Sequence, residues 1–377
     1  MRILFLTNYY NHHQSALANE LYRLCDEYLF IATKEMDEER RNMGWGQEQV
    51  PPYVVQYSAE PARCNAAIRD FDLVIFGDAP FSLIRQRVKS GKLVFVYSER
   101  ILKRGLLHRW NLRILPRMMR QFLGRKNCFL LAASGYAAGD FNLIGCFRDR
   151  VLRWGYFPGY LPCDNIRNII VQKQPASILW CARLIELKHP EVCIDLARRL
   201  KADGIPFHLD MIGAGAMEDT IREGIRKAGL EQDITMLGFM SPSQVLEHMR
   251  RSEIFLFTSN RMEGWGAVLN ESMNAGCAVV SSSAVGSTLF LIQDGVNGMV
   301  YRYGDQEDLY QRVRTLLTDP SLRQAMGERA YHTIADEWNH IHAAQALMRV
   351  TRDLLDGKGL VFEPSGPCSK AERITMF

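Results

Sequence analysis

Short apolar runs alternate with longer stretches of helical periodicity along most of the 377 residues, and this alternation constrains the fold more than any other feature. Runs this short have the length of β-strands, and their continuous apolar character is typical of strands covered on both faces. Strands separated by helices build parallel sheets between two helical layers. The sequence therefore predicts an α/β protein with doubly wound, Rossmann-like sheets.

The predicted strands form two sets, which favours two domains. The first set is Ile3–Leu6, Tyr28–Ala32, Val54–Tyr57, Leu73–Phe76, Leu93–Tyr97 and Cys128–Ala133. The second set is Ser177–Cys181, His208–Ile212, Ile234–Leu237, Ile254–Phe257, Ala278–Ser281 and Gly298–Tyr301. Turn residues in 155–174 separate the sets, so we expect domains over 1–160 and 161–338. A last helix is expected over 339–356, followed by a loose tail over 357–377.

Composition narrows the cellular setting. The nine cysteines include no C-x-x-C pair, which favours a reduced, cytoplasmic chain without a disulfide framework. No window approaches 18 uninterrupted apolar residues, so no transmembrane helix is expected. The balance of 46 basic and 42 acidic residues is uninformative, although the distribution of charge is not.

Ligands of open α/β sheets bind beyond the carboxyl ends of the strands. Arg183 and Lys188 follow Ser177–Cys181, where a guanidinium fork and an ammonium point charge can hold a diphosphate. Gly213 and Gly215 follow His208–Ile212 and let the backbone pass close to a ligand. A solvated loop and an ordinary tight turn are the alternative interpretations.

The segment EGWGAVLNESMNAG follows Ile254–Phe257 and begins a helix. Unpaired N–H groups at its start would face phosphate oxygens. These groups belong to Gly266, Ala267, Val268 and Leu269. Glu271 could accept hydrogen bonds from a ribose diol, and Glu263 could reach a sugar hydroxyl. Alternatively, Glu271 is a favourable acid near a helix start and Glu263 belongs to a solvated loop.

Five segments between about residues 176 and 300 together resemble retaining glycosyltransferases of family 4, which have the GT-B fold of two Rossmann-like domains facing across a cleft. The segments are ILWCARLIELKH, LDMIGAGAMED, ITMLGFMS, SEIFLFTSNRMEGWGAVLNESMNAG and IQDGVNGMVY. The E-x7-E spacing from Glu263 to Glu271 is the most recognisable mark of that family.

The resemblance implies roles for these residues. Arg183 and Lys188 would bind the diphosphate of a UDP- or GDP-linked sugar, and Glu271 would hold its ribose. Glu263 would contact the donor sugar as a catalytic residue. The other implied donor contacts are Gly213 and Gly215 at the nucleotide, Phe239 and Met240 near the base, and Gly264, Trp265, Gly266, Ala267, Val268 and Leu269 at the phosphates and sugar. It also implies that the last helix crosses back to the first domain and that no metal or further cofactor is needed.

The first half resembles the family only loosely. The loop TNYYNHHQ has no glycine, but it carries a polar cluster that could bind sugar hydroxyls or cap the first helix. Where relatives often carry a histidine, this chain has Ser98, Glu99 and Arg100. Glu99 could position the acceptor hydroxyl or pair with Arg100. The candidate catalytic residues here are His13 and Glu99, and the candidate acceptor-side residues are Asn11, His12, His13, Asp78, Ser98 and Arg100.

Residues 100–126 hold nine Lys/Arg residues, and no acid occurs between Glu99 and Asp140. Apolar residues recur there at helical spacing, and Pro116 would kink the helix. A membrane-facing role is predicted for Arg109, Trp110, Arg113, Arg117 and Arg120. A basic amphipathic stretch with tryptophan suits an anionic membrane surface, at the inner face of the cell membrane. The alternatives are a core-packed helix with a solvated basic face and a face for an anionic substrate. Nucleic acid is disfavoured because no stacking platform accompanies the charge.

Together with these observations, the resemblance implies a retaining, metal-independent glycosyltransferase. It would move a sugar from a nucleotide-diphosphate donor to a glycan or lipid-linked glycan acceptor in cell-surface polysaccharide biosynthesis. Two alternatives stay open: a sugar-nucleotide epimerase or phosphorylase on the same fold, and a non-catalytic sugar-nucleotide-binding peripheral membrane protein.

Overall fold

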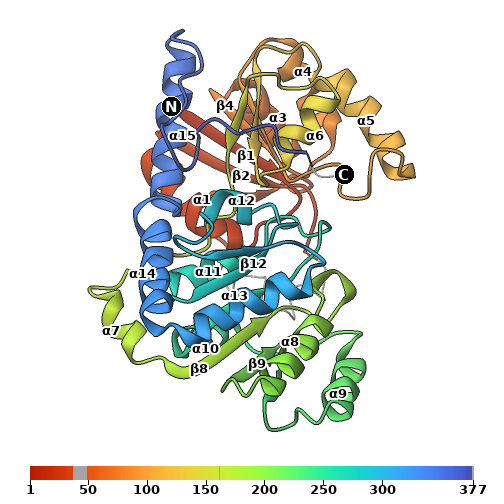
Figure 1. Ribbon diagram of the computed structural model, residues 1–377. Coiled ribbons are helices and arrows are strands. Elements are labelled where there is room, and N and C mark those ends of the chain that lie inside the picture. The colour runs from red at the N-terminus through yellow and green to blue at the C-terminus, as the bar shows by residue number, and fades with distance from the viewer. Residues whose placement is uncertain (37–48, 161, 376–377) are drawn as a thin grey trace. The chain divides into compact units, whose positions relative to one another are not determined.

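The computed structural model describes residues 1–36, 49–160 and 162–375, without the side chains of Arg109 and Trp110 (Figure 1). The chain forms two compact units. The first comprises Met1–Gly159 and Trp338–Phe377, and the second comprises Tyr160–Glu337.

The described part of the first unit is built on a parallel sheet with the strand order β3-β2-β1-β4-β5-β6-β7. Its strands are β1 (Arg2–Thr7), β2 (Glu27–Ala32), β3 (Val54–Gln56), β4 (Leu73–Phe76), β5 (Val94–Ser98), β6 (Cys128–Ala132) and β7 (Val151–Arg153). Its helices are α1 (His12–Leu24), α3 (Pro61–Asp70), α4 (Phe81–Lys89), α5 (Arg109–Phe122), α6 (Ala137–Leu143) and α15 (His340–Leu355).

The second unit repeats this plan with the strand order β10-β9-β8-β11-β12-β13. Its strands are β8 (Gln174–Cys181), β9 (His208–Ile212), β10 (Ile234–Gly238), β11 (Ser252–Phe257), β12 (Ala278–Ser282) and β13 (Met299–Tyr301). Its helices are α7 (Ile166–Val171), the 3₁₀ turn η1 (Glu186–Lys188), α8 (Glu191–Ala202), α9 (Glu218–Lys227), α10 (Pro242–Arg251), α11 (Val268–Asn274), α12 (Thr288–Leu291), α13 (Gln306–Thr318) and α14 (Pro320–Asp336).

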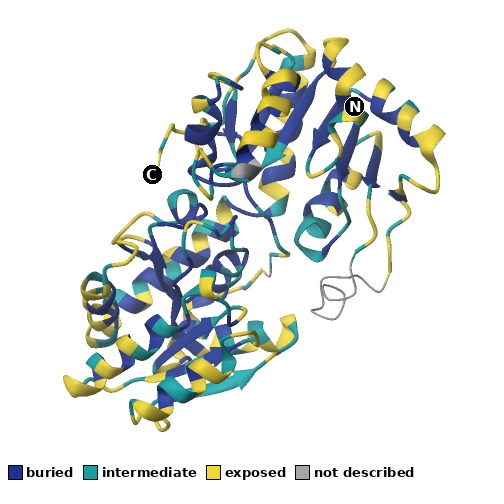
Figure 2. Ribbon diagram, turned by 90° about the vertical axis from the view of Figure 1, so that its right-hand side faces the viewer, coloured by how far each residue is buried: buried dark blue, intermediate teal, exposed yellow. Residues whose placement is uncertain are grey.

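The predicted fold class is confirmed. Each predicted strand is present, and the central strands are buried along most of their length, as continuous apolar runs require (Figure 2). Among the described strands, the sequence analysis missed β7. In each sheet the strand order reverses at one point, between β1 and β4 and between β8 and β11. Such switch points open a crevice at the carboxyl ends of the strands.

The prediction of a loose tail is wrong for its described residues. The tail runs antiparallel to the edge strand β7, where Arg153 N–H donates to Ser369 O at 2.7 Å and Cys368 N–H donates to Arg153 O at 2.8 Å. The Cys368 side chain is fully buried. An edge strand has unpaired backbone groups, and the tail satisfies those of β7. Before the tail, α15 packs against α1 of the same unit.

All nine cysteines carry free thiols. Within the described ranges no helix is both long and apolar enough to cross a bilayer.

Candidate functional site

Lys188 and Glu263, which were predicted to bind the sugar-nucleotide donor, meet at the switch point of the second sheet. They form an ion pair, and each side chain is only 13% exposed. Ser259 Oγ donates to the same Glu263 oxygen at 2.9 Å, and the Lys188 ammonium lies 5.9 Å from the centre of the Phe257 ring. The alternative interpretation, in which Glu263 belongs to a solvated loop, requires a freely solvated carboxylate. The observed contacts exclude that interpretation.

Hydrogen bonds from backbone and side-chain groups join the loops that carry this pair. Thr258 Oγ1 donates to Lys188 O at 2.6 Å, and Asn260 N–H donates to Leu187 O at 3.0 Å. Trp180 in β8 donates its indole N–H to Thr258 Oγ1 at 2.8 Å. The loops after β8 and β11 are thus fixed to one another, and their charged side chains are positioned before any ligand arrives.

Gly213 and Gly215 have a structural reason for being glycine. A Cβ at Gly213 would lie 1.9 Å from Ala182 O, and a Cβ at Gly215 would lie 2.5 Å from Leu184 O. Leu184 N–H donates to Ala214 O at 3.0 Å, so the two loops are in direct backbone contact. The glycines therefore bring the β9–α9 loop against the segment that carries Arg183.

Arg183 is exposed at the carboxyl end of β8 and makes no ion pair with a described residue. It thus differs from Lys188, whose charge is already compensated. Phe239 is 59% exposed just beyond β10, and Met240 beside it is half-buried. The guanidinium of Arg183 and the ring of Phe239 lie beyond the carboxyl ends of β8 and β10, two strands of the same sheet that β9 separates.

The start of α11 differs from the prediction at one position. The N–H of Leu269 donates to Gly266 O at 3.0 Å, so it is not available to a ligand. The N–H groups of Gly266, Ala267 and Val268 have no acceptor in the described structure. Gly266 has φ +79°, and a Cβ there would lie 2.2 Å from the Phe257 ring, so only glycine fits this turn.

Two residues of the E-x7-E segment contrast in their surroundings. The indole of Trp265 is fully buried and donates its N–H to Asn270 Oδ1 at 2.8 Å, so the predicted donor contact of Trp265 is limited to its backbone. Gly264 beside it is also buried. Glu271 is only partly exposed, and burial raises the pKa of its carboxyl to about 7. Its charge also helps to raise the pKa of Cys181, at the end of β8, after the larger effect of burial. The carboxyl group therefore lies at the same switch point.

In the first unit, the loops after β1 and β4 meet at the corresponding switch point, where Asn8 Nδ2 donates to Asp78 Oδ2 at 3.0 Å. Asn11 caps α1 by accepting from the His13 N–H at 3.0 Å, which favours the capping interpretation for this residue. The rings of His12 and His13 lie 3.8 Å apart. Burial, and to a smaller extent His12, lowers the pKa of His13 to about 3, so His13 is neutral at physiological pH.

Glu99 has partners that the sequence did not suggest. Tyr156 donates its hydroxyl to Glu99 Oε1 at 2.6 Å, and Lys103 contacts Glu99 Oε2 at 2.5 Å. The Tyr156 ring also stacks against His13, with centroids 6.0 Å apart. Tyr156 thus connects the two predicted catalytic residues of this unit. Lys103 could have been inferred from its i+4 spacing, whereas Tyr156 is 57 residues away from Glu99.

The prediction that Arg100 faces the acceptor is wrong. Arg100 is 4% exposed and pairs with the equally buried Asp140 at 3.3 Å, beneath the ring of Tyr136. It is part of the core, and it is not the partner of Glu99. Ser98 Oγ donates to the Glu99 carbonyl at 2.9 Å. The acceptor-side candidates that remain beyond β5 are therefore Ser98 and Glu99.

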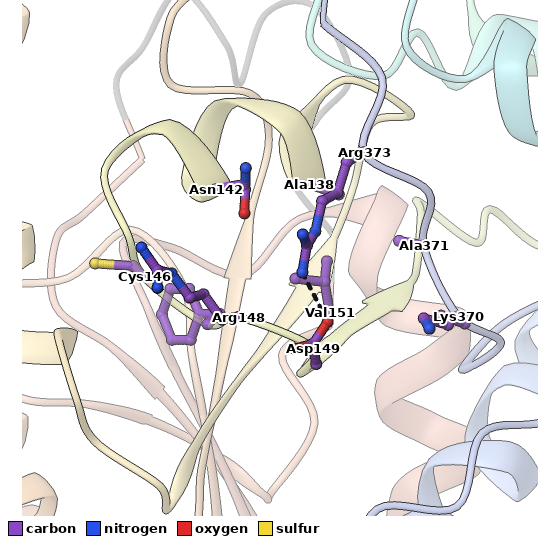
Figure 3. Close-up of a pocket in the computed structure, with 10 residues that line it drawn as sticks. Ala138, Asn142, Cys146, Arg148, Asp149, Val151, Lys370, Ala371 and Arg373 are labelled. Carbon is purple, nitrogen blue, oxygen red and sulfur yellow. Dashed lines mark hydrogen bonds and ion pairs between the residues drawn. The ribbon is translucent and has the colours of Figure 1, made fainter.

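A pocket near the tail involves none of the predicted site residues. Asn142, Arg148, Lys370 and Arg373 line it, and Arg373 pairs with Asp149 at 2.7 Å (Figure 3). The pocket lies before β7, at the amino ends of the strands.

The one Asp-x-Asp of the sequence, Asp70-Phe71-Asp72, likewise precedes β4. Asp72 accepts from the Arg2 N–H there at 2.7 Å. Both features lie on the opposite edge of the sheet from the switch point.

Comparison with known proteins gives these residues a context. Residues 164–333 match the family model described as "Glycosyl transferases group 1". The chain is 28% identical over 243 residues to the putative colanic acid biosynthesis glycosyltransferase WcaL of Salmonella typhimurium, covering 62% of this chain and 58% of WcaL. It is 30% identical over 250 residues to the amylovoran biosynthesis glycosyltransferase AmsK of Erwinia amylovora, covering 64% of this chain and 59% of AmsK. The match therefore spans about three-fifths of each relative.

Solved structures match nearly the whole chain. Anabaena HepE in complex with UDP has a TM-score of 0.69 at 17% identity, covering 94% of this chain and all of that one. The lipopolysaccharide outer core galactosyltransferase WaaB has a TM-score of 0.68 at 18% identity, and the match covers 95% of this chain and 100% of the WaaB chain. At this identity the likeness concerns the fold. The protein therefore has the GT-B fold, and its residues 164–333 match the group 1 glycosyltransferase domain.

Proposed function

We propose that this protein is a retaining, metal-independent glycosyltransferase that transfers a sugar from a UDP- or GDP-linked donor to a glycan or lipid-linked glycan. The observation that carries the proposal is the group formed by Arg183, Lys188, Glu263 and Glu271 at the switch point of the second sheet. It offers cations for a diphosphate and two carboxyl groups for hydroxyls, on loops fixed by hydrogen bonds.

The chemistry follows from the positions of these groups. Arg183 is free to bind a phosphate at once, whereas Lys188 must exchange part of its contact with Glu263 for the diphosphate. Cations and backbone N–H groups aimed at the diphosphate stabilise the charge that develops on it as the sugar–phosphate bond breaks. Glu263, released from Lys188, can then accept a hydrogen bond from the donor sugar. Glu271, when ionised, can accept hydrogen bonds from both hydroxyls of the ribose.

The acceptor side of the proposal rests on the first unit. Glu99 is oriented by Tyr156 and Lys103 and could accept the hydrogen bond of an attacking hydroxyl. His13 is neutral and could donate or accept a hydrogen bond without changing charge. The names of relatives support a lipid-linked glycan as acceptor. A Campylobacter jejuni relative, 30% identical over 153 residues, is named as a transferase acting on a diphospho-undecaprenol-linked sugar.

The first experiment measures donor binding by thermal shift with UDP, GDP, ADP and their common sugar conjugates. A ligand present at 100 times its dissociation constant adds about 2.7 kcal/mol of stability. We expect one base to stabilise the protein and 2′-deoxy-UDP or 2′-deoxy-GDP to do so less. Glu271→Gln should remove that preference for ribose, whereas Glu231→Gln, at an exposed position, should keep it. Equal binding of ribose and deoxyribose nucleotides would refute the role of Glu271.

The second experiment separates the proposal from its alternatives. Purified protein is incubated with the stabilising sugar nucleotide, with and without a polyprenyl-diphosphate-linked glycan. A transferase releases nucleoside diphosphate and moves labelled sugar into the lipid extract only when the acceptor is present. An epimerase would change the donor sugar without any acceptor, and a phosphorylase would require a sugar phosphate or inorganic phosphate. A binding protein would give a thermal shift and no product with any acceptor.

A further inference from the structure

Among the described side chains of helix α5, one apolar stripe packs against the first unit. Leu115, Met118 and Phe122 are buried, and the Phe122 ring packs against Phe76 and Phe81. These positions recur every three or four residues, as expected for a helix that covers a sheet. The helix lies beside α4 (Figure 1). The alternative interpretation, a core-packed helix, thus applies to this stripe.

A second apolar stripe on α5 is exposed. Leu112 is 61% exposed, Met119 is 36% exposed and Leu123 is 49% exposed. Their spacing of seven and then four residues places them on one line along the helix. Leu107, in the loop that leads into α5, is 83% exposed. Isolated exposed apolar residues are common, but an aligned set with an exposed leucine at its end indicates a contact surface.

A basic stripe runs beside this apolar one. Arg113, Arg117 and Arg120 are exposed, and none of them forms an ion pair with a described residue. Several helical arginines elsewhere on the surface pair with a glutamate one turn away, as Arg23 does with Glu20. On α5 that is impossible, because no acid occurs between Glu99 and Asp140. The uncompensated charge calls for an anionic partner.

We propose that this face of α5 binds the surface of an anionic lipid bilayer, with the helix lying along it. The stripe of Leu112, Met119 and Leu123 would enter the boundary between headgroups and acyl chains, and Arg113, Arg117 and Arg120 would contact lipid phosphates. A protein partner fits less well, because a stable interface takes about 20–30 residues per side and this face offers fewer than ten.

The position of α5 would bring the membrane surface close to the proposed acceptor residues. The helix follows β5, so its amino end lies at the carboxyl edge of the sheet, where Glu99 and Ser98 are found. A lipid-linked acceptor would thus be delivered at the edge that carries the proposed acceptor residues. The inference deepens the proposed function but is tested without it, since vesicle binding requires neither donor nor turnover.

The test is flotation of the full-length protein with vesicles of phosphatidylglycerol and phosphatidylcholine, compared with pure phosphatidylcholine. One variant carries Arg113→Gln, Arg117→Gln and Arg120→Gln, and another carries Leu112→Ser, Met119→Ser and Leu123→Ser. The matched control removes three exposed arginines of α3 and α4, by Arg63→Gln, Arg69→Gln and Arg85→Gln. Circular dichroism and thermal unfolding confirm that each variant is folded.

We expect the wild type and the control to bind anionic vesicles alike. Each cation near an anionic surface strengthens binding about fivefold, so the triple arginine variant should bind about 100-fold more weakly. The triple serine variant should also bind more weakly, with its residual binding abolished by salt. The proposal is overturned if the wild type does not bind anionic vesicles, or if the control loses as much binding as the α5 arginine variant. It is equally overturned if the wild type stays off vesicles and forms a dimer that the serine variant dissociates, because the face then binds a second copy.

Discussion

Glu271 should make the second unit less stable as the pH rises towards neutrality. Burial raises the pKa of its carboxyl from 4.5 to about 7, and no described group pairs with it. Between these two pH values the folded protein keeps a proton that the unfolded chain has released. The stabilising contribution is therefore complete below about pH 4.5 and is lost as the pH rises through about 7. At about 1.4 kcal/mol per pH unit, the loss is about 3 kcal/mol.

The substitution Glu271→Gln removes this titration and keeps the shape of the side chain. Urea unfolding of the wild type and of the variant is compared at pH 5 and pH 8, so that all other titrating groups cancel in the difference. The variant should gain about 2–3 kcal/mol relative to the wild type between these two pH values. Glu231→Gln, at an exposed position, should show no such gain. A difference that is constant with pH, or that decreases, would refute the burial argument for Glu271.

The same carboxyl group links stability to binding. An ionised Glu271 accepts hydrogen bonds from a ribose diol, whereas a protonated one offers fewer acceptors. The affinity for UDP-glucose, which has no phosphate ionisation near neutral pH, should weaken by up to about tenfold per pH unit below pH 7. In Glu271→Gln the affinity should be lower and independent of pH, as isothermal titration calorimetry would show.

Three further predictions concern packing and charge. Gly213→Ala puts a methyl group 1.9 Å from a backbone carbonyl and should cost about 3 kcal/mol, whereas Gly204→Ala meets open space and should cost about 1 kcal/mol; equal losses in urea unfolding would contradict this. Arg87→Met removes a buried guanidinium that donates to four backbone carbonyls and should cost about 3–5 kcal/mol, so a calorimetric loss below about 1 kcal/mol would count against it. Glu263→Gln should cost about 2–3 kcal/mol because Lys188 loses its partner, and adding Lys188→Met should restore stability but not donor binding. Recovery of binding in that double variant would disprove the role of the pair.

The sequence by itself determined the fold class and most of the strands. A strand buried on both faces must be continuously apolar, so the pattern is local and can be seen in the chain, as for β4 and β9, whose predicted bounds match the structure. The same holds for the positions of Arg183 and Glu263, because residues that follow a predicted strand lie at the carboxyl edge of its sheet. Among the described strands, β7 was the one that the sequence analysis missed.

Tertiary structure alone decided which side chains meet. The ion pair of Lys188 with Glu263 and the hydrogen bond from Tyr156 to Glu99 join residues 75 and 57 positions apart, and no local pattern specifies such pairs. The burial of Arg100 against Asp140 and the pairing of the tail with β7 were also beyond the sequence. From sequence alone, a polar residue or an irregular segment is predicted to be exposed. Its burial can be recognised only when its ion-pair or hydrogen-bond partner is known. The partners come from distant elements, so the chemistry of the site becomes visible only when the sheets are assembled.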